Sequence, residues 1–155
     1  MTKIENLQRH FTSYISGDSD LNYWERLKTL KLYSIERRRE RYVIIYMWKI
    51  LEGLVQPFNP NFSHRNNIRL GRFINVPPII HGNSAAIKNM IEKRLRGPKL
   101  FNKLPTHLRN MTNVSVTTFK THLDRYLSMI PDQPSIPGYV SHRAAESNSL
   151  IQQIT

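Results

Sequence analysis

The side chains in this sequence that are best suited to chemistry are arginines, and several of them are clustered. The densest run contains Arg37, Arg38, Arg39 and Arg41. The guanidinium group is planar and permanently charged, and it pairs two-pronged with phosphate oxygens. The run therefore predicts a phosphate-contacting surface. The alternative is a solvated helix face on which the neighbouring glutamates partner the arginines.

Two further basic groups follow along the chain. One contains Arg65, Arg69 and Arg72, and the other contains Lys93, Arg94, Arg96 and Lys99. If the three groups shared a face, they would form a positive groove whose binding to nucleic acid weakens steeply with salt. The sequence leaves open whether they do.

Residues for catalysis or metal binding do not cluster in the sequence. No two of the four aspartates are adjacent, whereas a two-metal polymerase centre needs carboxylates that hold ions a few ångströms apart. The six histidines show neither HxxxH nor HxH spacing, and neither a Walker loop nor a GxSxG elbow occurs. We therefore expect no catalytic residues, no metal and no cofactor.

The composition indicates a folded chain that attracts polyanions. Its 155 residues include 39% hydrophobic residues and carry a formal net charge of +12, so nucleic acid is the expected partner and an anionic membrane surface the second choice. The chain has no cysteine, and its longest apolar run is far shorter than a membrane span. We expect an intracellular protein, nuclear or cytoplasmic and not secreted.

Apolar spacing predicts a mainly α fold, a small bundle of about four to five helices. A first helix carries a stripe of Ile4, Leu7, Phe11 and Ile15, and a second begins at Asn22 with a capping box. A third runs from Ser34 to about Leu54. Because residues 42–51 are apolar almost all round, this helix should lie in the middle of the bundle.

The rest of the chain is expected to be less regular. A short β-hairpin is predicted near residues 68–76, and a last helix near Ser115 is predicted to pair Lys120 with Asp124 on its outer side. Four segments result. They are a helical bundle at 1–55, an irregular connector at 56–96, a helical part at 97–130 that packs on the bundle, and a loose Pro-rich tail at 131–155, in which residues 143–154 could form a weak helix.

Five short blocks stand in a particular order: QRHFT at 8–12, YWERLKTLKLYSIERR at 23–38, YMWKILEG at 46–53, RGPKLFNKLP at 96–105 and FKTHLD at 119–124. In this order they resemble the region after the catalytic palm in reverse transcriptases of non-long-terminal-repeat (LINE-type, jockey-like) retrotransposons. One departure is Phe101, where that family has Trp.

The resemblance implies the thumb and C-terminal region of an RNA-directed DNA polymerase. The thumb would grip the template–primer duplex through phosphate contacts, with Arg37, Arg38, Arg39 and Arg41 in the best position for them. An upstream palm and fingers domain would be a partner. The family's Asp-Asp motif is absent from this chain, so no activity of its own is implied.

Two other functions remain open. The chain could be a helical protein-interaction module derived from a retroelement fragment, or it could bind an anionic membrane through the basic helix. Self-association is also expected, through an apolar face that includes Tyr46, Trp48 and Ile50.

Overall fold

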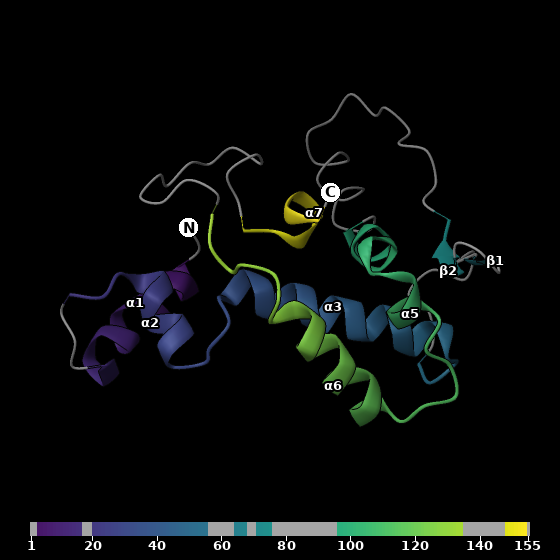
Figure 1. Ribbon diagram of the computed structural model, residues 1–155, viewed down its shortest axis with the longest axis horizontal. Helices are drawn as coiled ribbons and strands as arrows, with labels where there is room; N and C mark the ends of the chain where they lie inside the picture. Colours follow the sequence, from purple (N-terminus) through teal and green to yellow (C-terminus); the bar gives the residue numbers. More distant parts are fainter. Residues whose placement is uncertain are drawn as a thin grey trace. The chain divides into compact units, whose positions relative to one another are not determined.

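The computed structural model describes residues 3–16, 20–55, 64–67, 71–75, 96–134 and 148–154. These residues are mainly helical, which confirms the predicted fold class (Figure 1). The elements are α1 (Lys3–Ser16), α2 (Tyr23–Thr29), α3 (Ile35–Leu51), β1 (His64–Asn67), β2 (Gly71–Ile74), α5 (Thr106–Arg109), α6 (Val116–Leu127) and α7 (Leu150–Gln153). Residues 96–103 are helical as well.

Contacts divide the chain into two compact units. The first unit consists of Met1–Glu40 and Met129–Thr155, and the second is Arg41–Ser128. The first turns of α3 therefore belong to one unit and the remainder of α3 to the other. The four segments expected from sequence character stay a prediction.

Helix starts in the first unit follow the predicted caps. Asn22 Oδ1 accepts hydrogen bonds from the backbone of Trp24 and Glu25, and the Glu25 carboxylate returns one from the Asn22 N–H, which confirms the capping box. Ser34 caps α3, since its Oγ accepts from the Arg37 N–H at 3.1 Å.

The first helix is confirmed, but it buries a polar face. Glu5 and Thr12 are buried, whereas the stripe of Ile4, Leu7, Phe11 and Ile15 is at least half exposed at every position. The predicted helical period is therefore correct, and the apolar stripe that it produces faces water.

The core of the second unit forms around Trp48. Its ring stacks on Phe119 with centroids 4.5 Å apart, and its indole N–H donates to the carbonyl of Met111 at 2.7 Å. Phe119 belongs to α6, which begins near Ser115 as predicted, and Ser115 is its N-cap. The other buried apolar side chains of this unit include Ile44, Ile74, Leu100, Phe101, Leu104, Leu108, Leu123 and Leu127.

The apolar half of α3 is not enclosed on all sides. Ile44, Met47 and Trp48 are buried, but Tyr42 and Tyr46 are 65% and 43% exposed. The expectation of a helix in the middle of a bundle was therefore wrong for this face. A tyrosine fits such a position because its hydroxyl can stay in water.

The predicted hairpin is present, with its first strand earlier than expected. β1 pairs antiparallel with β2, and the register joins His64 to Ile74 and Asn67 to Gly71. The residues expected to form the first strand, 68–70, lie outside the described part of the chain. The backbone of Ile74 is also bonded by the Asn102 side chain, through both its N–H and its carbonyl.

The chain end is more ordered than the expected loose tail. Residues 135–147 lie outside the described ranges, but 148–154 contain α7, and Asn148, Ser149 and Leu150 are buried. These three residues pack against the start of α3 by contacts described below.

Candidate functional site

Arg37, expected to contact phosphate, is fully buried in the first unit. Its Nη2 donates to the Pro131 carbonyl at 2.9 Å and to Gln153 Oε1 at 2.5 Å, and its Nε lies 3.8 Å from Asp132. Burial lowers the pKa of Arg37, and Asp132 opposes that shift. Arg37 thus holds the fold together, and its guanidinium is not available to a phosphate.

A polar network surrounds this buried cation. Asp132 accepts from the Ser34 N–H at 2.6 Å and from the Ser34 hydroxyl at 2.8 Å, and the Asn148 amide donates to both Ser34 and Asp132. The network joins residues more than ninety positions apart in sequence to the start of α3.

Glu40, one turn further along α3, binds the same C-terminal segment. Its carboxylate accepts from the Ser149 hydroxyl at 2.5 Å and from the Leu150 N–H at 2.8 Å, and Glu40 is fully buried. The alternative interpretation, a solvated helix face on which this glutamate pairs with neighbouring arginines, does not hold for Glu40 because it is buried. Arg37 and Glu40 together fix the first turns of α3.

Arg41 is held by a two-pronged ion pair in the second unit. Its Nε and Nη2 lie 2.5 and 2.7 Å from the two carboxylate oxygens of Asp124. The predicted Lys120–Asp124 pair is thus replaced by a longer-range one, because arginine matches a carboxylate with two parallel hydrogen bonds.

Arg72, from the second predicted group, is also buried. It forms an ion pair with Glu52 at 2.6 Å and donates to the carbonyls of Arg109 and Met111. Arg109 donates in return to the Arg72 carbonyl at 3.0 Å, and burial lowers the pKa of Arg109. This paired arrangement fastens β2 to the end of α5 and leaves neither guanidinium for a ligand.

Of the ten predicted residues, the structure leaves few with outward side chains. Arg39 is exposed, and Arg38, Arg96 and Lys99 are half-buried. Arg65 lies in β1, but its side chain is outside the described set, as are Arg69 and Arg94 entirely. The three groups are therefore not shown to share one face, and their role in binding stays a prediction.

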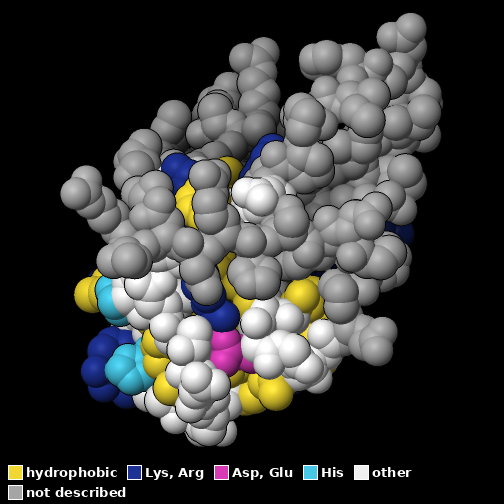
Figure 2. Space-filling view, turned by 90° about the vertical axis from the view of Figure 1, so that its right-hand side faces the viewer, with side chains coloured by type: hydrophobic (Ala, Val, Ile, Leu, Met, Phe, Trp, Pro, Cys, Tyr) yellow, Lys and Arg dark blue, Asp and Glu magenta, His cyan; other side chains and the backbone are white. Residues whose placement is uncertain are grey.

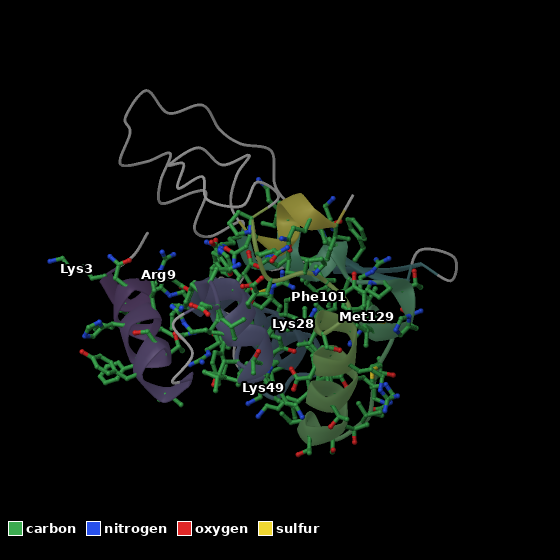
Figure 3. All side chains as sticks on the ribbon, turned by 60° about the vertical axis from the view of Figure 1, so that its left-hand side comes forward. Lys3, Arg9, Lys28, Lys49, Phe101 and Met129 are labelled. Atoms are coloured by element: carbon green, nitrogen blue, oxygen red, sulfur yellow. The ribbon has the colours of Figure 1, made fainter. Side chains whose placement is uncertain are left out.

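Other cations that sequence reasoning passed over lie at the surface. Lys28, Lys31 and Arg125 are exposed, and Lys49 and Lys120 are half-buried. Lys28 and Lys49 are labelled in Figure 3. No local motif identifies these single residues, because isolated lysines are common on any protein surface.

The face of the molecule in Figure 2 shows how charge is distributed there. Lysine and arginine side chains show at several separate places on this face, histidine side chains lie toward its lower left, and acidic side chains show near its middle. Among the described residues, no group of three His, Asp or Glu side chains is positioned to hold a metal ion.

The apolar face that was expected to mediate self-association is only partly exposed. Trp48 is fully buried, and of its expected companions only Tyr46 is substantially exposed. The exposed apolar stripe is instead on α1. In the described ranges, no helix combines the length and the apolar character needed to cross a bilayer.

Comparisons with protein-family models, curated proteins and solved structures find no match to this chain. The resemblance to the retrotransposon reverse transcriptases thus stays a prediction, and function must be inferred from the residues and contacts described above.

Proposed function

We propose that this chain binds the phosphate backbone of nucleic acid, without sequence preference, through cations that the fold leaves at its surface. The observation that carries the proposal is that many carboxylates are bonded to other groups of the same chain. Six of the eleven acidic residues have a carboxylate bonded to other groups of the chain, although Glu25 is exposed: Glu5, Glu25, Glu40, Glu52, Asp124 and Asp132.

Internal pairing matters because it decides where the surplus charge lies. The carboxylates of Glu52 and Asp124 neutralise Arg72 and Arg41 within the second unit. Glu5 and Glu40 are buried and bonded to hydroxyl and backbone groups. These carboxylates are occupied by partners within the chain, and the net charge of +12 attracts polyanions.

Arg38 and Arg39 are the residues best placed to contact phosphate. They are adjacent on α3, and neither takes part in an ion pair that the structure records among the described residues. The turn that carries them is fixed by the buried neighbours Arg37 and Glu40. A fixed backbone limits the entropy that is lost when the two side chains bind a ligand.

The resemblance to the reverse transcriptase thumb supports the same proposal. That region grips a template–primer duplex through its backbone; Arg38 is the last residue of the matching block at 23–38, and Arg39 follows it directly. An RNA–DNA hybrid is therefore the first ligand to test.

The test is fluorescence anisotropy of a labelled RNA–DNA hybrid with the full chain. We expect Arg38→Ala/Arg39→Ala to weaken binding most, by ~10-fold or more at low salt, because two charge-assisted phosphate contacts are lost. Arg38→Lys/Arg39→Lys keeps the charge and should lose less.

The matched controls are Lys28→Ala/Lys31→Ala and Lys120→Ala/Arg125→Ala, which remove the same charge elsewhere. An equal loss of affinity in all three double-alanine variants would show that binding depends on the total charge and not on particular residues of α3. An unchanged affinity in all of them would overturn the proposal.

A second function is favoured by one observation. The exposed apolar stripe of α1 suits a helical protein-interaction module better than it suits a nucleic-acid contact. If the folded chain binds no oligonucleotide at low salt, nucleic-acid binding is excluded and the protein-interaction module becomes the favoured function.

A further inference from the structure

α1 presents its apolar side chains to water because specific polar contacts turn its other side inward. The Glu5 carboxylate accepts from the Tyr23 hydroxyl and from the Ile35 N–H at 3.0 Å. The Gln8 amide donates to the Tyr33 carbonyl at 3.0 Å, and the Arg9 guanidinium lies 4.8 Å above the Tyr23 ring. The rotation of the helix about its axis is thus set by hydrogen bonds.

The exposed side forms one continuous apolar stripe, which we define by five residues. At 100° per residue they fall within about a quarter to a third of the helix circumference. Their exposed fractions are 50% for Ile4, 56% for Leu7, 62% for Phe11, 73% for Tyr14 and 67% for Ile15. Scattered single apolar residues on a surface are ordinary, but a stripe along a whole helix marks an interface.

We propose that this stripe is the interface through which two copies of the chain pair, with their α1 helices antiparallel. Side chains of this size present on the order of 150–200 Å² each when fully exposed. The stripe therefore leaves about 500 Å² of apolar surface in water, and two copies would bury ~1,000 Å², the lower limit for a specific interface. A dimer with micromolar affinity is expected.

Local charge permits this pairing even though the whole chain is strongly positive. α1 carries few charges, and two of them, Glu5 and Arg9, face its own unit. Lys3 lies at the helix N-terminus, the positive end of the helix dipole (Figure 3). An antiparallel partner brings Lys3 to the negative end of the other helix.

The charges on α1 also make a membrane surface a less suitable partner for the stripe than a second copy of the chain. A helix that lies in an acidic bilayer interface carries several Lys or Arg on its polar side. The exposed polar positions of α1 are Lys3, Asn6, His10 and Ser13, of which only Lys3 is permanently charged. A second copy offers an apolar stripe of equal length instead.

Sedimentation velocity over the micromolar concentration range tests the pairing. It should be run at high salt, which weakens nucleic-acid bridging and leaves apolar association intact. We expect the wild type to dimerise and Leu7→Gln/Phe11→Gln to stay monomeric with unchanged helix content. Met129→Gln removes an equally exposed apolar side chain elsewhere and should still dimerise.

Cross-linking tests the antiparallel geometry directly, because the chain has no native cysteine. Antiparallel pairing about the centre of α1 places Leu7 of one copy opposite Phe11 of the other. A mixture of Leu7→Cys and Phe11→Cys chains should therefore form mostly mixed disulfides. Like-with-like disulfides would contradict the geometry.

Three outcomes would overturn the proposal. One is a monomer at every concentration, and another is a dimer indifferent to Leu7→Gln/Phe11→Gln. The third is a monomeric wild type that binds vesicles of neutral and acidic lipid and loses that binding in the variant, since it would assign the stripe to a membrane.

Discussion

Neighbouring arginines in one run have opposite roles, and their place on the helix separates them. Arg37, Glu40 and Ile44 recur at spacings of three and four and are all buried, whereas Arg39 points into water. Successive residues are rotated by about 100° around a helix. A shift of one or two positions therefore separates a buried arginine that bonds other parts of the fold from an arginine at the surface.

We predict that Arg37→Ala lowers the free energy of unfolding by about 3 kcal/mol, because it leaves Asp132 and several carbonyls without their buried partner. Arg39→Ala removes the same charge two residues away, and its free energy of unfolding should stay within about 0.5 kcal/mol of the wild-type value. Urea unfolding followed by circular dichroism measures both. Similar losses in the two variants would contradict the assigned roles.

The contact between Tyr23 and Glu5 predicts a pH dependence. Burial and the hydrogen bond to Glu5 raise the pKa of Tyr23 above its ordinary value near 10. The folded chain keeps this proton where the unfolded chain loses it, so the contribution to stability is complete below about pH 10 and is lost as the pH rises above it.

In Tyr23→Phe we expect stability lower by about 1 kcal/mol at neutral pH, from the lost hydrogen bond, and a shallower decline above pH 10 than in wild type. Unfolding curves at a series of alkaline pH values measure both. Tyr46→Phe, at a partly exposed tyrosine, is the matched control. An equally shallow decline in the control would show that the Tyr23 contact is not the cause.

Sequence alone predicts which residues start and end helices better than it predicts side-chain partners. Asn22 and Ser34 were correctly predicted as caps, because a cap bonds backbone two or three residues away. The partners of Arg37 lie 94 to 116 residues away, so no local pattern could reveal them.

At the scale of the element, α1 shows that the helical spacing of apolar residues does not decide which face of the helix is buried. The apolar stripe fixed the helix and its length, yet the polar residues Glu5 and Gln8 found partners inside the unit. A sequence pattern that assumes apolar burial cannot anticipate specific polar contacts of this kind.

The start of β2 permits a sharp element-scale prediction. Gly71 has a φ of +69°, and a Cβ there would lie 2.5 Å from Asn110 Oδ1, the atom that accepts from the Arg72 N–H. We expect Gly71→Ala to destabilise the chain by about 2–4 kcal/mol, through backbone strain together with overpacking.

Gly53→Ala is the matched control for the strain, since Gly53 has a φ of +70° and open space around its Cα. It should cost only about 1 kcal/mol. Thermal unfolding of the two variants measures the difference. If Gly53→Ala costs as much as Gly71→Ala, the close packing of β2 against Asn110 does not matter for stability.

At the scale of the whole molecule, the first unit combines an N-terminal and a C-terminal segment of the chain. Glu40 and Arg37 bind residues 148–153, and Ser34 binds Asp132. The sequence predicted a loose tail there because residues 131–155 contain few apolar positions. Polar side chains hold the segment instead, and hydrophobic patterning does not detect such contacts.

The distribution of charge is the other whole-molecule property. Composition predicted a positive chain, and the structure adds that many of its carboxylates are bonded internally. This arrangement concentrates positive charge on lysines and on the few outward arginines. Its expected consequence is attraction to polyanions that depends on salt and is indifferent to sequence.

The most direct measurement is the affinity of the full chain for an RNA–DNA hybrid as a function of salt concentration. We predict that log K falls linearly with log salt, that unrelated sequences give the same line, and that Arg38→Ala/Arg39→Ala reduces the slope by about two. A folded chain that does not bind at low salt, or whose binding does not respond to salt, would contradict the account.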